Sequence, residues 1–349
     1  MLKMKAIDLF CGAGGLTVGL KMAGFDVISA IEKETIVSET YNFNHPDVKL
    51  INGDIRAISP DALMRQLQIQ QGELDLLAGC PPCQGFSSLR TKNKTAAVFD
   101  ERNELIFNFL EFVKVFLPKV VMVENVPALA SDERIIIFTS KLQQLGYHID
   151  DNSVVVEDAS KFGVPQRRRR MVLLASRYGK ITRAAKNSSL TTVREAIGHL
   201  TNPEDSTDPL HNIVEKRTEK VKKIISLIPK DGGSRSDLPY EYWLPCHKRY
   251  PNGFRDVYGR MKWDDVAPTI TSGCTNPSKG RFLHPEQDRA ITLREAALLQ
   301  TFPKNYYFPV KFGKDKAALM IGNALPPEFI KRHAELIKEH IAINEANYG

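Results

Sequence analysis

Two cysteines three positions apart, Cys80 and Cys83, are the residues of this sequence best placed to do chemistry. They lie in the stretch GCPPCQGFS, with Pro81 and Pro82 between them. Such a pair could hold a metal ion, form a redox couple, or contain one nucleophile beside an uninvolved cysteine. The two prolines restrict the backbone and remove two N–H donors, so we expect one side chain to be held rigidly here.

The other cysteines narrow these possibilities. The chain has five cysteines, an odd and sparse number that disfavours a disulfide framework. A zinc site would need a second close pair of ligands, and the adjacent residues Cys246 and His247 are poorly spaced to share one ion, so no metal is expected. A redox pair normally begins a helix, whereas the polar stretch after Cys83 has no helical pattern and is typical of a mobile loop over a site. A zinc site and a redox pair are therefore both disfavoured.

A glycine-rich turn predicts an adenosine pocket. The stretch DLFCGAGGL places glycines at the first strand-to-helix turn, where backbone N–H groups can approach a ligand closely. Glu32 ends the second strand, where a carboxylate accepts hydrogen bonds from ribose hydroxyls, and Asp54 ends the next strand and could accept from an adenine amino group. Thr17 breaks the full dinucleotide pattern after Gly12 and Gly14, so the pocket need not be one for NAD.

The elements that position these residues alternate in type. Apolar, β-branched runs predict strands and 3.6-residue periodicity predicts helices. The expected strands are 5–10, 26–31, 74–79, 119–123, 152–158 and 169–176, and the expected helices include 15–23, 103–117 and 327–345. Alternation of this kind predicts an α/β fold with a mostly parallel sheet, whose chemistry gathers at the carboxyl ends of its strands.

The composition changes beyond residue 185. From 200 to 290 the chain is rich in Pro, Gly, Ser, Lys and Arg, which predicts a second, smaller, loop-rich domain. We therefore expect a catalytic domain of residues 1–185, completed by 305–349, and a second domain of 186–304. Residues 161–262 hold 22 Lys and Arg against 10 Asp and Glu, whereas the whole chain has a net charge of +7. This local excess favours a polyanionic partner, most simply nucleic acid.

The amino-terminal stretch MLKMKAIDLF is interpreted as a buried strand and not as a signal peptide, because Asp8 interrupts its apolar run. No apolar run approaches the ~20 residues of a membrane helix. We therefore expect a cytoplasmic protein without a membrane partner.

The motifs DLFCGAGG, GCPPCQGFS, ENV, QRRRR, REAALLQTFP and IGNALPP occur in the order found in the cytosine-C5 DNA methyltransferases. The chain resembles that family, and within it the bacterial modification enzymes. The resemblance implies a class I S-adenosylmethionine-dependent methyltransferase with a Rossmann-like, mostly parallel sheet. It also implies that the second domain recognises the target DNA.

The resemblance implies a reaction that suits these residues. Carbon 5 of cytosine is a poor nucleophile until a thiolate adds at carbon 6, which calls for a cysteine. Cys83 matches the family's nucleophile, Glu124 of ENV the group that holds the N3 and amine edge, and Arg168 and Arg170 of QRRRR the arginines that contact O2 and steady the site. Cys80 is expected only to pack behind the site.

The positions that match the family's cofactor pocket are more widely spread along the sequence than the catalytic positions. S-adenosylmethionine supplies the methyl group, and S-adenosylhomocysteine is the product. The matching positions are Phe10, Gly12, Gly14, Gly15, Leu16, Glu32, Asp54, Ile55, Pro82, Leu105, Asn323 and Leu325.

The substrate implied is a cytosine in double-stranded DNA, rotated out of the helix, within a short palindrome of roughly four to six base pairs by family analogy. Candidate DNA contacts are Gln84, Ser87, Ser88, Arg90, Arg255, Arg260, Thr269, Thr271, Lys279 and Arg281. We expect a nucleoid-associated monomer, with a restriction endonuclease acting on the same site as a possible counterpart.

Three alternatives stay open at this point. A tRNA methyltransferase of the same family usually carries a Cys-Phe-Thr tripeptide, which this sequence lacks. A catalytically silent DNA-binding regulator should have lost Cys83, Glu124 or the GNALP motif, and all are present. A nicotinamide oxidoreductase is disfavoured by the broken glycine spacing and by the ENV and QRRRR motifs.

Overall fold

The computed structural model describes residues 3–82, 104–213, 215–253 and 255–348, and the chain divides into two compact units. Unit 1 comprises Met1–Phe162, Arg169–Lys186 and Leu325–Gly349, and unit 2 comprises Gly163–Arg168 and Asn187–Ala324. From the sequence we expected the chain to re-enter the catalytic domain at residue 305, whereas in the structure it re-enters unit 1 at Leu325. Residues 305–324 belong to unit 2, because their helix α11 (Lys314–Asn323) packs against α10 (Leu293–Leu299) there.

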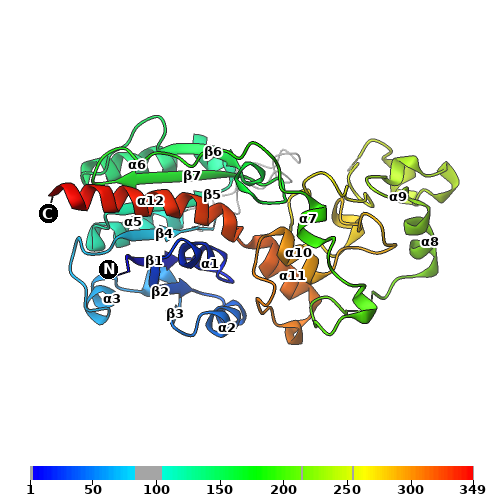
Figure 1. Ribbon diagram of the computed structural model, residues 1–349, viewed down its shortest axis with the longest axis horizontal. Coiled ribbons are helices and arrows are strands. Elements are labelled where there is room, and N and C mark those ends of the chain that lie inside the picture. The colour runs from blue at the N-terminus through cyan, green and yellow to red at the C-terminus, as the bar shows by residue number, and fades with distance from the viewer. Residues whose placement is uncertain (1–2, 83–103, 214, 254, 349) are drawn as a thin grey trace. The chain divides into compact units, whose positions relative to one another are not determined.

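Unit 1 is built on a sheet (Figure 1) of seven strands among the described residues, in the order β3-β2-β1-β4-β5-β7-β6. The strands are β1 (Lys5–Leu9), β2 (Asp26–Glu32), β3 (Lys49–Asn52), β4 (Leu76–Gly79), β5 (Val120–Asn125), β6 (Val154–Asp158) and β7 (Arg169–Ser176). The first five strands pair in parallel, which confirms the mostly parallel sheet.

Strand β7 runs antiparallel to both of its neighbours, β5 and β6. Residues 159–168 join β6 to β7. This connection is shorter than the dozen or more residues that a parallel crossover requires, so the chain has to reverse direction. The amino end of β7, where the QRRRR motif lies, therefore meets the carboxyl end of β5.

Helices cover both faces of this sheet. They are α1 (Gly15–Met22), α2 (Thr35–Asn44), α3 (Pro60–Gln66), α5 (Leu105–Phe116), α6 (Glu133–Gln144) and α12 (Pro327–Tyr348). The carboxyl-terminal helix α12 packs against α1 on one face (Figure 1), so closely that a Cβ added at Gly19 would lie 2.5 Å from that of Ile330. On the other face α5 buries Phe109, Phe112 and Phe116 at helical spacing.

Unit 2 is loop-rich, as the sequence indicates. Its helices are α7 (Val193–Ile197), α8 (Glu219–Leu227), α9 (Pro245–Arg249), α10 (Leu293–Leu299) and α11 (Lys314–Asn323). Single-turn 3₁₀ helices complete both units: η1 (Ile55–Ala57), η4 (Pro127–Ser131), η5 (Ala159–Phe162), η6 (Pro203–Asp205), η7 (Arg235–Asp237), η8 (Tyr240–Tyr242), η9 (Pro277–Lys279) and η10 (Val310–Phe312). Within the described part of unit 2, strand pairing is limited to isolated bridges such as Arg260↔Leu283.

Arg260 is a structural residue of unit 2, and its assignment as a DNA contact is wrong. Its side chain is fully buried at 0% exposure. The guanidinium donates to the carbonyl oxygens of Ile225, Ile228, His284 and Gln287 and pairs with Asp288. Irregular backbone leaves carbonyls without ladder partners, and one arginine with five donors satisfies several of them at once.

Replacing Arg260 by Met should destabilise unit 2. The apolar side chain would leave four buried carbonyls without their donor and would leave Asp288 with Lys230 as its remaining partner, so we expect the free energy of unfolding to fall by about 3–5 kcal/mol. Chemical denaturation measures this loss. Arg255→Met is the matched control, because Arg255 is exposed and its one side-chain hydrogen bond within the described ranges goes to the exposed Asn252. Equal denaturation midpoints for the two variants would contradict the structural role.

Candidate active site

The residues that could take part in catalysis or cofactor binding lie at one edge of the sheet. Strands β1, β2, β4 and β5 are mutually parallel, so their carboxyl ends meet there. Phe10 follows β1, Glu32 ends β2, Cys80 follows β4, and Glu124 lies at the end of β5. The predicted convergence of Phe10, Glu32 and Glu124 therefore corresponds to the observed strand order.

The glycine-rich turn between β1 and α1 adopts the left-handed backbone that its glycines permit, with φ of 55° at Gly12 and 94° at Gly14. The Gly12 N–H donates to Oε2 of Glu32 at 2.9 Å, which ties the turn to the end of β2. A Cβ added at Gly12 would meet no atom within 4 Å, so the turn faces open space. At Gly15 the same atom would lie 2.2 Å from the carbonyl oxygen of Leu325, so only glycine allows this approach.

Two buried carboxyl groups lie under this turn. Burial raises the pKa of Asp8 to about 7, and it also raises the pKa of Glu32. Thr17 donates to Oδ2 of Asp8 at 2.7 Å and lies 2.7 Å from the Tyr41 hydroxyl, whereas Oδ1 of Asp8 has no hydrogen-bond partner among the described residues. The base of the turn is therefore rich in carboxyl groups.

The other predicted cofactor residues take varied positions. The side chain of Arg56 pairs with Asp54 at 2.6 Å, and its hydrogen bonds hold the pKa of Asp54 well below the usual range. Ile55 is buried and Leu105 begins α5, packed against the core of unit 1. Leu16 is buried in α1, Phe10 and Pro82 are half-buried, and Asn323 is exposed at the end of α11.

Glu124 is the most buried glutamate at the edge. It is 1% exposed, and its Oε1 lies 2.9 Å from Nε of Arg170 at the amino end of β7. Its Oε2 lies 2.7 Å from the Cys80 sulfur atom, which the hydrogen-bond geometry makes the donor. The structure thus brings Glu124 and Arg170 together as predicted and adds Cys80, which was expected only to pack behind the site.

Asn125 is a site residue that the sequence interpretation missed. Its buried amide donates to the carbonyl oxygen of Pro81 at 2.8 Å, and its own Oδ1 accepts the N–H of Val126. A polar amide at the end of an apolar strand is the signal that could have revealed it. Asn125 fixes the backbone that leads toward Cys83.

Arg168 does not join Glu124 in the way that Arg170 does. It belongs to unit 2, is 2% exposed, and donates to the carbonyl oxygens of Ile270, Gly322 and Ala324 at 3.0 to 3.1 Å. These bonds give Arg168 a supporting role inside unit 2 and use some of the five N–H donors of its guanidinium. Its predicted contact with the base stays a prediction.

The predicted DNA contacts in unit 2 separate into two groups. Arg281 is half-buried, and one nitrogen of its guanidinium donates to the carbonyl oxygens of Gly232, Gly233 and Arg260, so it supports the backbone, and its assignment as a DNA contact stays a prediction. Arg255, Thr271 and Lys279 are exposed, and Thr269 is half-buried and donates to the carbonyl of Arg167. Cys83, Gln84, Ser87, Ser88 and Arg90 lie outside the described residues.

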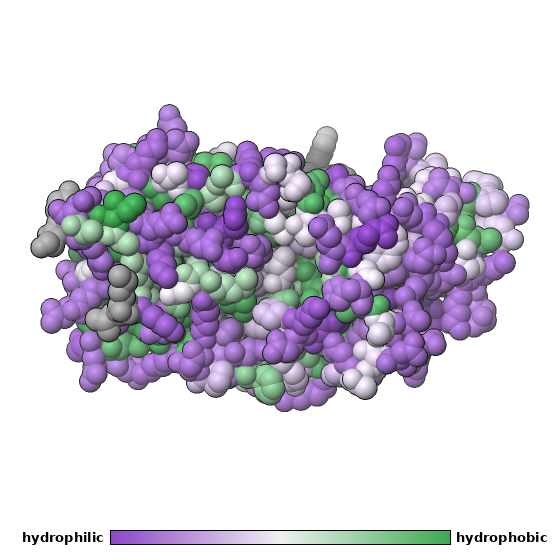
Figure 2. Space-filling view, viewed as in Figure 1, coloured by the Kyte–Doolittle hydropathy of each residue, from purple (hydrophilic) through white to green (hydrophobic). Residues whose placement is uncertain are grey.

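A further basic surface is formed by α8 and α9. Lys220, Lys223, Lys248 and Arg249 are exposed on these helices, and no acidic side chain in the described part of the chain pairs with them. The inner faces of α8 and of the segment before α9 share one small apolar core that includes Ile224, Ile225, Trp243 and Leu244. Hydrophilic residues dominate the end of unit 2 that carries these helices (Figure 2). We call Lys220, Lys223, Lys248 and Arg249 the α8–α9 surface.

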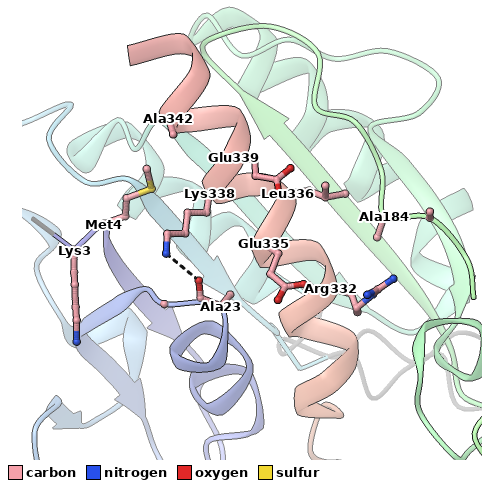
Figure 3. A pocket seen from close by; sticks show the side chains of 12 residues that line it. Lys3, Met4, Ala23, Ala184, Arg332, Glu335, Leu336, Lys338, Glu339 and Ala342 are labelled. Carbon is pink, nitrogen blue, oxygen red and sulfur yellow. Dashed lines mark hydrogen bonds between the residues drawn. The ribbon is translucent and has the colours of Figure 1, made fainter. Parts of the chain in front are cut away.

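A groove of about 720 Å³ lies elsewhere in unit 1 (Figure 3). It is lined by Lys3 and Met4, by Ala23 and by side chains of α12, including Lys338, which donates to the Ala23 carbonyl. Because Lys3 and Met4 precede β1, the groove lies at the amino end of that strand. It is therefore separate from the carboxyl edge where the motifs gather.

Comparison with known proteins agrees with this arrangement. A family model for C-5 cytosine-specific DNA methylases matches residues 4–339. The type II methylase M.HgiDII of Herpetosiphon aurantiacus is 37% identical over 352 residues, covering 96% of this chain and 95% of that protein. The type II methyltransferase M1.HphI of Haemophilus parahaemolyticus is 34% identical over 339 residues, covering 95% of this chain and 86% of that protein.

Solved structures share the fold. A protein described as a DNA modification methyltransferase encoded within an E. coli prophage aligns with a TM-score of 0.69 and 23% identity, covering 97% of this chain and 100% of that one. The Entamoeba histolytica methyltransferase EhMeth aligns with a TM-score of 0.67 and 15% identity, covering 98% and 99%. The fold is thus that of a class I methyltransferase.

The chain belongs to the family of C-5 cytosine-specific DNA methylases. It is therefore a DNA cytosine-5 methyltransferase whose methyl donor is S-adenosylmethionine. Among the described residues, no group of three or more His, Cys, Asp or Glu side chains is arranged to hold a metal ion. The described helices include none that is long and apolar enough to cross a membrane.

Asp8 should make stability depend on pH. Its folded-state pKa of about 7 exceeds its ordinary value of 3.8, so the native state keeps a proton that the unfolded chain loses. This penalty is absent below pH ~4, grows through pH 4–7 and is complete above pH ~7, where it amounts to about 2–4 kcal/mol. Asp8→Asn should therefore gain stability relative to the wild type as pH rises from 5 to 8.

Denaturant titrations at pH 5, 6, 7 and 8 measure this difference. Asp61→Asn, which alters an exposed carboxylate of α3, is the control and should show a constant offset from the wild type. A constant offset for Asp8→Asn as well would contradict the raised pKa of Asp8.

Proposed function

We propose that Cys83 adds to carbon 6 of the target cytosine while Glu124 and Arg170 hold the base. The observation that carries this proposal is the buried Glu124–Arg170 pair beside Pro81, at the start of the segment that contains Cys83. Addition of the thiolate makes carbon 5 nucleophilic enough to accept a methyl group. A base, such as water, then removes the proton from carbon 5, and the thiol leaves.

The other described cysteines are poorly suited to this role. Burial raises the pKa of the Cys11 thiol well above its usual value and that of Cys274 to about 12, which disfavours the reactive thiolate form. Cys246 is exposed in helix α9 of unit 2 and is not part of the sheet edge in unit 1 that carries Glu124. Cys80 donates to Glu124, and Cys83, which follows Pro82 and matches the family motif, is the proposed nucleophile.

The residues around the glycine turn fit a cationic, adenosine-containing cofactor. S-adenosylmethionine supplies an electrophilic methyl group when it is bound. The open space at Gly12 allows close approach, and the carboxylates of Glu32 and Asp54 accept hydrogen bonds from ribose and adenine. Phe10, Gly14, Gly15, Leu16, Ile55, Pro82, Leu105, Asn323 and Leu325 would complete the pocket by the family pattern.

The DNA is held by unit 2 in this proposal. Thr269 and Thr271 lie near the flipped nucleotide, Arg255 and Lys279 contact the duplex, and Gln84, Ser87, Ser88 and Arg90 fill the space that the base leaves. The α8–α9 surface binds phosphates, because its cations are exposed and have no acidic partners in the described structure. The enzyme acts as a monomer on a short palindrome in nucleoid DNA, and a restriction endonuclease of the same specificity is its counterpart.

Cys83→Ala and Glu124→Gln should both abolish methylation. The first removes the nucleophile, and the second removes the charge that Arg170 pairs with and that the cytosine edge requires. We expect a loss of at least about a thousandfold from Cys83→Ala and about a hundredfold or more from Glu124→Gln. Incorporation of labelled methyl groups from S-adenosylmethionine into plasmid DNA measures both rates, and bisulfite sequencing of the product identifies the modified site.

The same assay with tRNA as substrate is the control for the tRNA alternative. Label in tRNA and none in plasmid would overturn the DNA substrate. Undiminished labelling of plasmid by Cys83→Ala would overturn the assignment of the nucleophile.

Combined substitution of Lys220, Lys223 and Arg249 by Ala should weaken DNA binding without changing sequence preference. Phosphate contacts are insensitive to sequence, and each contact contributes about 0.9 to the slope of log affinity against log salt. We expect that slope to fall by about 2–3 and the affinities for cognate and non-cognate duplexes to fall in parallel. Fluorescence anisotropy titrations across 50–200 mM salt measure both quantities.

A triple variant with the same loss of charge on unit 1, Lys49→Ala with Lys141→Ala and Lys161→Ala, is the matched control. All three lysines are exposed. A salt slope that falls equally in both triple variants would show a general charge effect and would contradict phosphate binding by the α8–α9 surface.

A further inference from the structure

Cys80 is attached to two strands of the carboxyl edge. It follows β4 directly, and its backbone N–H donates to the carbonyl oxygen of Leu9 in β1 at 3.2 Å. Its thiol contacts Oε2 of Glu124 at 2.7 Å, although the two residues are 44 positions apart. The sheet order, in which β4 lies between β1 and β5, brings these groups together.

The Glu124 carboxylate is therefore held from two sides. Arg170 lies at Oε1 and Cys80 at Oε2, and the side chain is almost fully buried. The terminal torsion of a glutamate is broad, so one partner alone leaves the plane of the carboxylate poorly defined. A second donor on the other oxygen selects one orientation. A carboxylate offers about four acceptor sites, so the thiol contact leaves Oε2 able to accept a hydrogen bond from a base as well.

We propose that Cys80 is a positioning residue for Glu124, which it orients by a thiol–carboxylate hydrogen bond opposite Arg170. The inference rests on the proposed role of Glu124 in holding the cytosine edge. It replaces the sequence-based expectation that Cys80 only packs behind the site. A misoriented carboxylate meets the base with poorer geometry, so the loss of Cys80 slows methyl transfer more than it weakens the binding of either substrate.

Three substitutions separate orientation from packing. Cys80→Ala keeps a small side chain and removes the donor, Cys80→Ser restores a donor at the same position, and Cys246→Ala removes an exposed thiol of unit 2 as the control. A thiol is a weak donor, so we expect Cys80→Ala to slow the single-turnover rate about three- to tenfold. The KM values for DNA and S-adenosylmethionine stay within about twofold, and Cys80→Ser recovers most of the rate.

The thermal midpoint of each variant is measured in parallel, so that a loss of folding is not mistaken for a loss of orientation. A wild-type rate for Cys80→Ala would overturn the proposal, as would a Cys80→Ser rate as slow as that of Cys80→Ala. Glu124→Gln in the same assay tests the role of Glu124 separately from the role of Cys80. An active Glu124→Gln enzyme overturns the proposed function of Glu124, whereas an inactive one beside a fully active Cys80→Ala overturns only the role of Cys80.

Discussion

The pairing of Glu124 with Arg170 is the interaction on which the active-site edge depends. A buried carboxylate is tolerated only when charge and hydrogen bonds compensate for its lost hydration. The compensating arginine comes from the amino end of β7, and it can reach the carboxyl end of β5 only because β7 runs antiparallel. A parallel β7 would carry the QRRRR motif to the opposite edge of the sheet. The antiparallel direction of β7 is thus required both by the short connection from β6 and by the pairing of Arg170 with Glu124.

In unit 2, arginine side chains have a second role: they donate hydrogen bonds to backbone carbonyls that are not bonded within helices or sheets. Arg168, Arg260 and Arg281 together donate to ten backbone carbonyl oxygens, counting each hydrogen bond once. Loops lack the ladder bonds that satisfy carbonyls in a sheet, and a planar guanidinium can serve several of them. Part of the basic excess of the sequence therefore stabilises the fold, and the exposed lysines of the α8–α9 surface are the part that faces outward.

The sequence predicts the elements well because β-branched runs and helical spacing report local burial. It predicts Glu124 and Arg170 through motif chemistry. It does not predict the direction of β7, because hydrophobic periodicity carries no information about strand direction. The Cys80–Glu124 contact is equally hidden, since it depends on the order of β4 and β5 in the sheet. Charge alone did not distinguish the buried Arg260 from the exposed Arg255, because both lie in the same basic segment.

One departure from the local rules of unit 1 lies at the glycine turn. Gln68 and Leu117, the other non-glycine residues with positive φ in the described part of unit 1, lie just after helix ends, where a left-handed residue is ordinary. Phe10, with φ of 64°, instead follows a strand, and it lies two residues after the incompletely bonded carboxyl group of Asp8. A strained backbone and an incompletely bonded buried carboxyl group both destabilise the free protein. These two unfavourable features of unit 1 lie at the turn where the cofactor is expected to bind.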